Sequence, residues 1–270
     1  MHKVKERGNK TMKIDNRKKH FIILDTETTA SCSPEENQQK KVMEKLVYDL
    51  GYTITTKKEI LVKRNYLVEE IYTNEDLMNN AYFASKKPIY EQMVKAGKVE
   101  IKPLAEVIKI LQKDIINYNA QVFGAYNVGF DLDAIMQTVN YVYPNTFKMI
   151  FKKTKAGNYA PDTIKFISTY VFHKDLEIID LWTMACKTLC NQITFQTYYL
   201  QETEKGNIKS NAEIVYNYIT DQEMKFAEDH TALSDSIVES EILFRMLRLH
   251  KSIGNKFEFM PFRQIERKVA

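Results

Sequence analysis

Two acidic residues one position apart, Asp25 and Glu27, directly follow a short apolar run, residues 21–24. Such a run is typical of a buried strand, and the carboxyl end of a strand is where α/β sheets place their active sites. In a regular strand, residues i and i+2 point to one face, so the two carboxylates can converge on one point. A buried carboxylate is costly without a positive partner, so we expect a cation nearby. Alone, the pair fits a structural ion pair or a solvated strand end equally well.

Three further residues have side chains suited to the same site. Asp131 follows a second apolar run, residues 121–126, and Asp235 lies on the last predicted helix, five positions after His230. Mg²⁺ and Mn²⁺ prefer carboxylate oxygens as ligands. Two such ions about 3.5–4 Å apart can stabilise the entering and the leaving oxygen of a phosphoryl displacement. A histidine beside them is the group that can take a proton from an attacking water near neutral pH.

The elements that must position these residues are those of an α/β protein. Apolar and β-branched runs predict strands over 21–24, 121–126 and 178–179, and a hairpin with halves at 46–56 and 60–68. Helical spacing predicts helices over 74–96, 103–115, 181–186, 210–218 and 231–249, and a further helix that follows the polar residues 127–131 and runs through Ile135 and Val139. Residues 30–45 are expected to form a polar loop. Asp180 is a helix N-cap candidate, with a place as a fifth site acid as the alternative, and Ser210 with Glu213 is typical of a capping box.

Composition places the chain among ordinary globular proteins. Of its 270 residues, 44% are hydrophobic and 27% are charged. The apolar runs are far shorter than the roughly 20 residues of a membrane helix, so we expect no membrane partner. Three cysteines at unrelated spacings suggest no disulfide framework, which favours a cytoplasmic location.

The charge is concentrated at the amino terminus. Residues 1–20 carry eight Lys or Arg and two acids, which leaves the rest of the chain with a net charge of −2 out of the total of +4. A basic arm can hold a polyanion by counterion release, and a frayed, solvated terminus is the alternative. We expect deletion of residues 1–19 to weaken nucleic-acid binding and flatten its salt dependence. A second basic run, Lys152 to Lys155, is interpreted as a solvated loop, with phosphate contact as the alternative.

Three short motifs carry a resemblance to a known family. Residues 21–29, 126–131 and 230–235 resemble, in order, the three exonuclease motifs of the DEDDh family of DnaQ-like and RNase T-like 3′–5′ exonucleases. The similarity covers about residues 20–250, and the sequence as a whole resembles bacteriophage-encoded members of the family. The spacing between motifs is longer than in compact members, which predicts insertions. Ala30 stands where the family often has Gly, which puts the local backbone path beside the substrate in question.

The resemblance implies an α/β, ribonuclease H-like fold, with a mixed sheet of about five strands and helices on both faces. It divides the chain into a basic arm (1–19), an exonuclease domain (20–250) and a tail (251–270). It implies four carboxylates that bind two Mg²⁺ or Mn²⁺ ions, a histidine as general base, and two residues near the terminal nucleotide. The carboxylates are those of Asp25, Glu27, Asp131 and Asp235. The general base is His230, and the residues near the terminal nucleotide are Thr28 and Asn127.

The implied activity is hydrolysis of nucleic acid from its 3′ end to nucleoside 5′-monophosphates, with single-stranded DNA as the favoured substrate. An exoribonuclease is one alternative, because the same motifs serve RNA. A proofreading or binding subunit that docks on a DNA polymerase is another, for which the apolar tail around Phe257, Phe259, Met260 and Phe262 is a candidate segment. Packing of that tail on the body explains its composition equally well.

Overall fold

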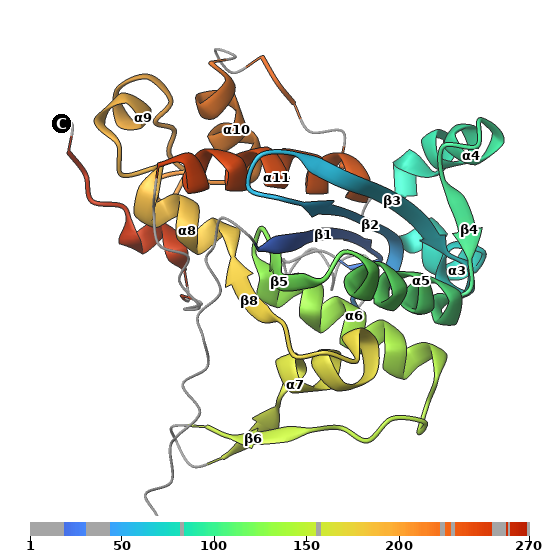
Figure 1. Ribbon diagram of the computed structural model, residues 1–270. Coiled ribbons are helices and arrows are strands. Elements are labelled where there is room, and N and C mark those ends of the chain that lie inside the picture. Colours follow the sequence, from blue (N-terminus) through green and yellow to red (C-terminus); the bar gives the residue numbers. More distant parts are fainter. Residues whose placement is uncertain are drawn as a thin grey trace, which may run out of the picture.

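The computed structural model describes residues 19–30, 44–81, 84–154, 158–221, 225–227, 230–249, 258 and 260–268. Its centre is a mixed sheet of six strands in the order β4-β3-β2-β1-β5-β8, with helices on both faces (Figure 1). The strands are β1 (His20–Thr28), β2 (Val47–Thr55), β3 (Ile60–Val68), β4 (Glu100–Lys102), β5 (Ala120–Ala125) and β8 (Glu177–Asp180). The α/β class with a mixed sheet is as expected. The count of about five strands is wrong by one, because the short β4 pairs in parallel with the edge of β3.

Strand β1 lies at the middle of the sheet and carries the first motif. It pairs antiparallel with β2 and parallel with β5, which in turn pairs parallel with β8. The predicted hairpin of β2 and β3 is confirmed, with its turn between Thr55 and Ile60. The acids Asp25 and Glu27 lie within β1 and not after its end, since the strand continues to Thr28.

The two faces of β1 bury different side chains, as its alternation requires. Ile22 and Leu24 join the apolar core shared with α5 (Leu104–Asn117) and α6 (Val128–Val142). Phe21 and Ile23 join the core shared with α8 (Leu181–Thr188) and α11 (Ala232–Arg248). A strand buried on both faces explains why its sequence is a continuous apolar run.

The helix expected over 74–96 is divided into shorter pieces, α3 (Glu75–Asn80), η2 (Ala84–Lys86) and α4 (Lys87–Lys95), preceded by α2 (Glu69–Tyr72). The Asn74 side chain caps α3 by accepting from the amide of Leu77. Pro88 favours a new helix start because it has no amide hydrogen to donate. Gly97 follows α4 with a positive φ of 65°, a conformation that glycine adopts readily at the end of a helix.

The carboxyl-terminal half adds small elements around the sheet. They are β6 (Phe151–Lys153), β7 (Tyr159–Pro161), α7 (Thr163–Ile167), a π-helical turn η3 (Ser168–Phe172), α9 (Ile193–Tyr198), α10 (Ala212–Thr220) and η4 (Pro261–Gln264). The capping box predicted at Ser210 is wrong: Asn211 is the N-cap residue of α10, and it makes no side-chain cap bond. The hydroxyl of Ser210 instead accepts a hydrogen bond from Trp182 Nε1 at 2.9 Å.

The described part of the tail packs on the body. The ring of Phe262 lies 6.3 Å from that of Trp182, centroid to centroid, and Ile265 is buried. Phe257 and Phe259, residues 1–18 of the arm and the loop from 31 to 43 lie outside the described residues. Among the helices that are described, none is long and apolar enough to cross a membrane.

Candidate functional site

The four predicted carboxylates come from three elements. Asp25 and Glu27 are two residues apart on β1, Asp131 lies in the first turn of α6, and Asp235 lies in the first turn of α11. Helix α11 packs across β2 and β1, which brings its first turn to the strand. Helix amino termini favour negative charge, so the positions of Asp131 and Asp235 offset part of the cost of burying them.

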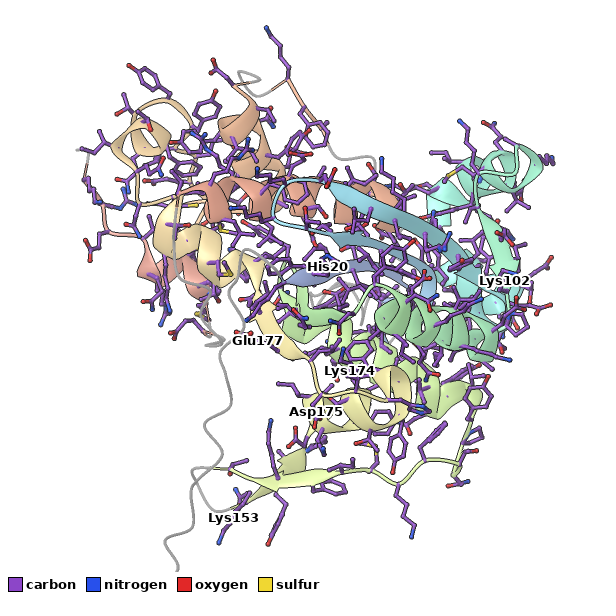
Figure 2. The ribbon with its side chains drawn as sticks, in the orientation of Figure 1. His20, Lys102, Lys153, Lys174, Asp175 and Glu177 are labelled. Carbon is purple, nitrogen blue, oxygen red and sulfur yellow. The ribbon has the colours of Figure 1, made fainter. Side chains whose placement is uncertain are left out.

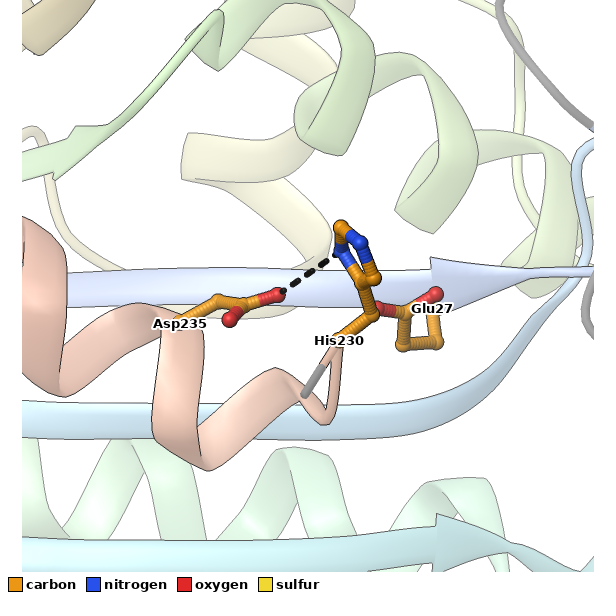
Figure 3. Close-up of side chains that lie close together, drawn as sticks. All are labelled: Glu27, His230 and Asp235. Atoms are coloured by element: carbon orange, nitrogen blue, oxygen red, sulfur yellow. Dashed lines mark ion pairs between the residues drawn. The ribbon is translucent and has the colours of Figure 1, made fainter. Parts of the chain in front are cut away.

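Glu27, His230 and Asp235 offer ligand atoms that all lie within 4.8 Å of one another. Figure 3 shows His230 between Asp235 on α11 and Glu27 on β1. His230 Nδ1 lies 3.9 Å from Asp235 Oδ2, and the histidine side chain is 42% exposed. The histidine is therefore close to the carboxylates and reachable from solvent.

The electrostatics join the remaining acids to this cluster. Burial raises the pKa of Asp25 well above its usual value, and the charges of Asp131, Asp235 and Glu27 raise it further. Burial and the nearby charge of Asp235 likewise raise the pKa of Glu27. Asp25 and Asp131 are not among the residues whose ligand atoms lie within 4.8 Å of one another, so within the described part of the chain the electrostatic effects link them to the cluster.

Asp131 is tied to the first motif by a direct bond. Its Oδ1 accepts a hydrogen bond from Thr26 Oγ1 at 2.8 Å, between β1 and α6. Burial raises the pKa of Asp131 to about 7, while this bond acts in the opposite direction. Clustered carboxylates with raised pKa values are the surroundings that a bound divalent cation neutralises, and carboxylate oxygens are its preferred ligands. These residues therefore fit such ions.

Two residues of the motifs have left-handed backbones. Asn127, the N-cap residue of α6, has a φ of 71°, and His230 has a φ of 52°. Non-glycine residues rarely adopt this conformation, although Asn and His do so more readily than most. The His230 backbone is also held from outside its own motif, because Lys86 Nζ donates to its carbonyl oxygen at 3.1 Å.

The start of α11 is fixed against β2. The carboxylate of Asp49, fully buried on β2, accepts from the amide of Ala232 at 3.0 Å and from the hydroxyl of Tyr90 at 2.8 Å. The helix also approaches β2 closely at Gly51, where a Cβ would lie 2.1 Å from the amide nitrogen of Leu233. Further along the helix, the hydroxyl oxygens of Thr53 and Ser240 lie 2.7 Å apart. The site therefore depends on a tight contact between the helix and the strand beside β1.

The predicted neighbours of the site have definite structural roles. Thr28 Oγ1 donates to the carbonyl of Ala30 at 2.6 Å, so it holds the turn after β1. Asp180 is the N-cap of α8, as expected, accepting from the amide of Thr183 at 3.1 Å. Its other oxygen accepts from the amide of Asn127 at 3.1 Å, so it also supports the second motif.

Sequence reasoning missed three residues around the site. Glu239 is buried one helical turn after Asp235, and its charge raises the pKa of Asp25. Asp49 lies directly opposite Glu27 in the β1–β2 register. Glu239 had a signal, since it falls on the buried stripe of α11. Lys86 had none, because it comes from the short helix η2, 40 or more residues from each of the three motifs.

No protein-family model matches this chain, and a search of curated proteins gives no match. The assignment of a function therefore depends on the motifs and on the arrangement of the site.

Proposed function

We propose that this protein is a metal-dependent 3′–5′ exonuclease with a ribonuclease H-like fold and the DEDDh set of residues. Its substrate is nucleic acid, single-stranded DNA in the first place, and its products are nucleoside 5′-monophosphates. One observation carries the proposal: Glu27 of the first motif and His230 and Asp235 of the third offer ligand atoms within 4.8 Å of one another, and Asp131 of the second motif is hydrogen-bonded to Thr26, the neighbour of Asp25 and Glu27. The mixed sheet with helices on both faces is compatible with this fold.

In this proposal, Asp25, Glu27, Asp131 and Asp235 would hold two Mg²⁺ or Mn²⁺ ions. When bound, such ions supply positive charge for the entering and the leaving oxygen of the scissile phosphate. The hydroxyl of Thr26 orients Asp131, and the carboxylate of Asp180 holds the backbone of Asn127, in the same motif as Asp131. Thr26 and Asp180 would thus keep the metal-binding carboxylates in place when no substrate is bound.

His230 is the general base of the proposal. Its ring is partly exposed, which lets it reach a water molecule at the entrance of the site, and its Nδ1 faces the carboxylate of Asp235. In the hydrolytic step the ring takes a proton from the attacking water, and the new P–O bond forms as the bond to the 3′ oxygen of the preceding nucleotide breaks. The 3′ oxygen leaves with the bonding electron pair and takes a proton from solvent, which gives a 3′-hydroxyl. A positioned base of this kind contributes about 10²- to 10⁴-fold to the rate.

The test is a time course with 5′-labelled single-stranded DNA and RNA of one sequence, in Mg²⁺, Mn²⁺ or EDTA. We expect a ladder that shortens from the 3′ end, requires the metal and is absent in Asp25→Ala. The faster polymer identifies the substrate class, so a preference for RNA would make the protein an exoribonuclease. If neither polymer is shortened, the proposal fails and a polymerase-associated binding subunit becomes the leading interpretation.

A further inference from the structure

A short two-stranded sheet projects from the molecule away from the six-stranded sheet. It consists of β6 and β7 and lies below α7 in the view of Figure 1. Antiparallel pairing places Phe151 opposite Pro161 and Lys153 opposite Tyr159. Directly opposite residues and residues two apart share one face of a hairpin. The four side chains therefore lie on the same face.

This face exposes two aromatic rings. Phe151 is 57% exposed and Tyr159 is 73% exposed. Exposed apolar side chains are common singly, but here two exposed rings stand at diagonal positions on one face of a small sheet, which suits a partner. Flat rings held in this way can stack on other flat, partly apolar groups.

The segment that contains the hairpin is basic. The sequence from 148 to 165 contains five lysines and one acid. Lys165 lies 3.5 Å from Asp175, which is outside this segment. Lys153 is exposed on the aromatic face, and Figure 2 shows it on the projecting hairpin. Lys152, on the other face, lies 3.5 Å from the single acid, Asp162. Among the described residues, no ion pair involves Lys153, so the aromatic face carries its positive charge.

We propose that this hairpin face is a second contact for single-stranded nucleic acid. Rings that stack on unpaired bases, next to lysines that meet phosphates, are the two elements with which proteins hold single strands without reading their sequence. A duplex would not suit the rings, because its bases are already stacked on each other. The proposal rests on the proposed function for its biological meaning: the hairpin would hold the strand whose 3′ end is being shortened.

The test measures binding separately from hydrolysis. The full-length protein is titrated into a 5′-fluorescein-labelled 30-nucleotide oligo(dT) or oligo(U), with anisotropy as the readout, in EDTA and at several salt concentrations. A gel shows that the oligonucleotide stays intact. The variants are F151A/Y159A, which removes the rings, and K153Q, which removes the positive charge on their face. The matched controls are Y198A, an exposed tyrosine of α9, and K58Q, an exposed lysine elsewhere.

We expect F151A/Y159A to raise the Kd for the single strand about tenfold or more, as the loss of stacked bases does in other proteins. K153Q should raise the Kd and lower the slope of log Kd against log salt by about one. Both control variants should bind like the wild type.

The proposal is overturned if both hairpin variants keep the wild-type circular dichroism spectrum and also the wild-type Kd and salt slope. It is equally overturned if the controls lose as much affinity as the hairpin variants, since binding would then not be local. Neither result depends on catalysis, so a protein without exonuclease activity could still support the hairpin, and an active exonuclease could still refute it.

Discussion

Lys86 donates a hydrogen bond from its Nζ to the backbone carbonyl oxygen of His230, across 3.1 Å. Lys86 ends η2, in the segment between β3 and β4, whereas His230 immediately precedes the start of α11. The positive charge of Lys86 also acts on Glu27, whose pKa it lowers against the opposing effect of burial. A segment outside the three motifs thus holds the backbone that carries the proposed base.

Replacement of Lys86 by Met should therefore impair turnover more than substrate binding. Without the bond, the left-handed backbone of His230 loses a support, and a displaced base costs about tenfold or more in rate. We expect a fall in kcat with a small change in KM for K86M, and partial rescue in K86R, which keeps the charge and a donor. K87M, at the adjacent lysine, is the control. Equal kcat values for K86M and K87M would contradict this role.

The imidazole of His230 is best tested with Asn, because Asn tolerates the φ of 52° that His230 adopts. H230N should keep the fold and the metal dependence of its melting temperature, while kcat falls by about 10²- to 10⁴-fold. An alanine at this position would add backbone strain to the loss of the ring, so H230A should be both inactive and less stable. A kcat for H230N within a factor of three of the wild type would exclude His230 as the base.

Much of the fold follows from local patterns in the sequence. The continuous apolar run at residues 21–24 forms the central strand because both of its faces are covered. Asp180 caps α8 because it is a polar residue at the junction between a strand and an apolar helix. The capping box at Ser210 was wrong for a tertiary reason, since Trp182 uses the Ser210 hydroxyl. The division of the helix expected over 74–96 had local signals in Asn74 and Pro88 that the apolar spacing outweighed.

The candidate site divides in the same way. Asp25 and Glu27 could be placed on one face from their spacing alone, and the motif order indicated Asp131 and Asp235 as their partners. Asp49 and Lys86 could not be predicted in this way. Asp49 depends on the β1–β2 register, and Lys86 depends on a contact across 144 positions of the chain. Register and long-range packing arise from the whole fold and leave no periodic signal in the residues themselves.

Gly51 should not tolerate a side chain. A Cβ there would lie 2.1 Å from the amide nitrogen of Leu233 and 2.2 Å from the carbonyl carbon of Ala232, and both are backbone atoms that cannot rotate away. G51A is expected to push the start of α11 from β2, with a loss of about 2 kcal/mol or more of stability and a loss of activity. For stability, G129A is the control, because a Cβ at Gly129 meets nothing within 4 Å. Urea unfolding that gives equal stabilities for G51A and G129A would show that the contact is not tight.

The buried acid Asp131 should make stability depend on pH in a defined direction. Burial raises its pKa from 3.8 to about 7, so between these values the folded protein holds more protons than the unfolded chain. Asp131 therefore lowers the free energy of unfolding progressively as pH rises from about 4 to about 7. D131N removes this loss, and its side-chain oxygen can still accept the hydrogen bond from Thr26. In EDTA, the stability gained by D131N should grow over this range and level off above it, at on the order of a few kcal/mol.

Metal should stabilise the wild type more than it stabilises D131N. An ion that binds only the folded state adds stability, about 2.7 kcal/mol at a concentration of 100 times its Kd. At pH 8, Mg²⁺ or Mn²⁺ should thus raise the melting temperature of the wild type more than that of D131N, which has lost a ligand charge. The measurement is thermal unfolding followed by circular dichroism, with and without EDTA. An equal rise in both proteins would place the ion away from Asp131, and no rise in either would show that the acids hold no ion without substrate.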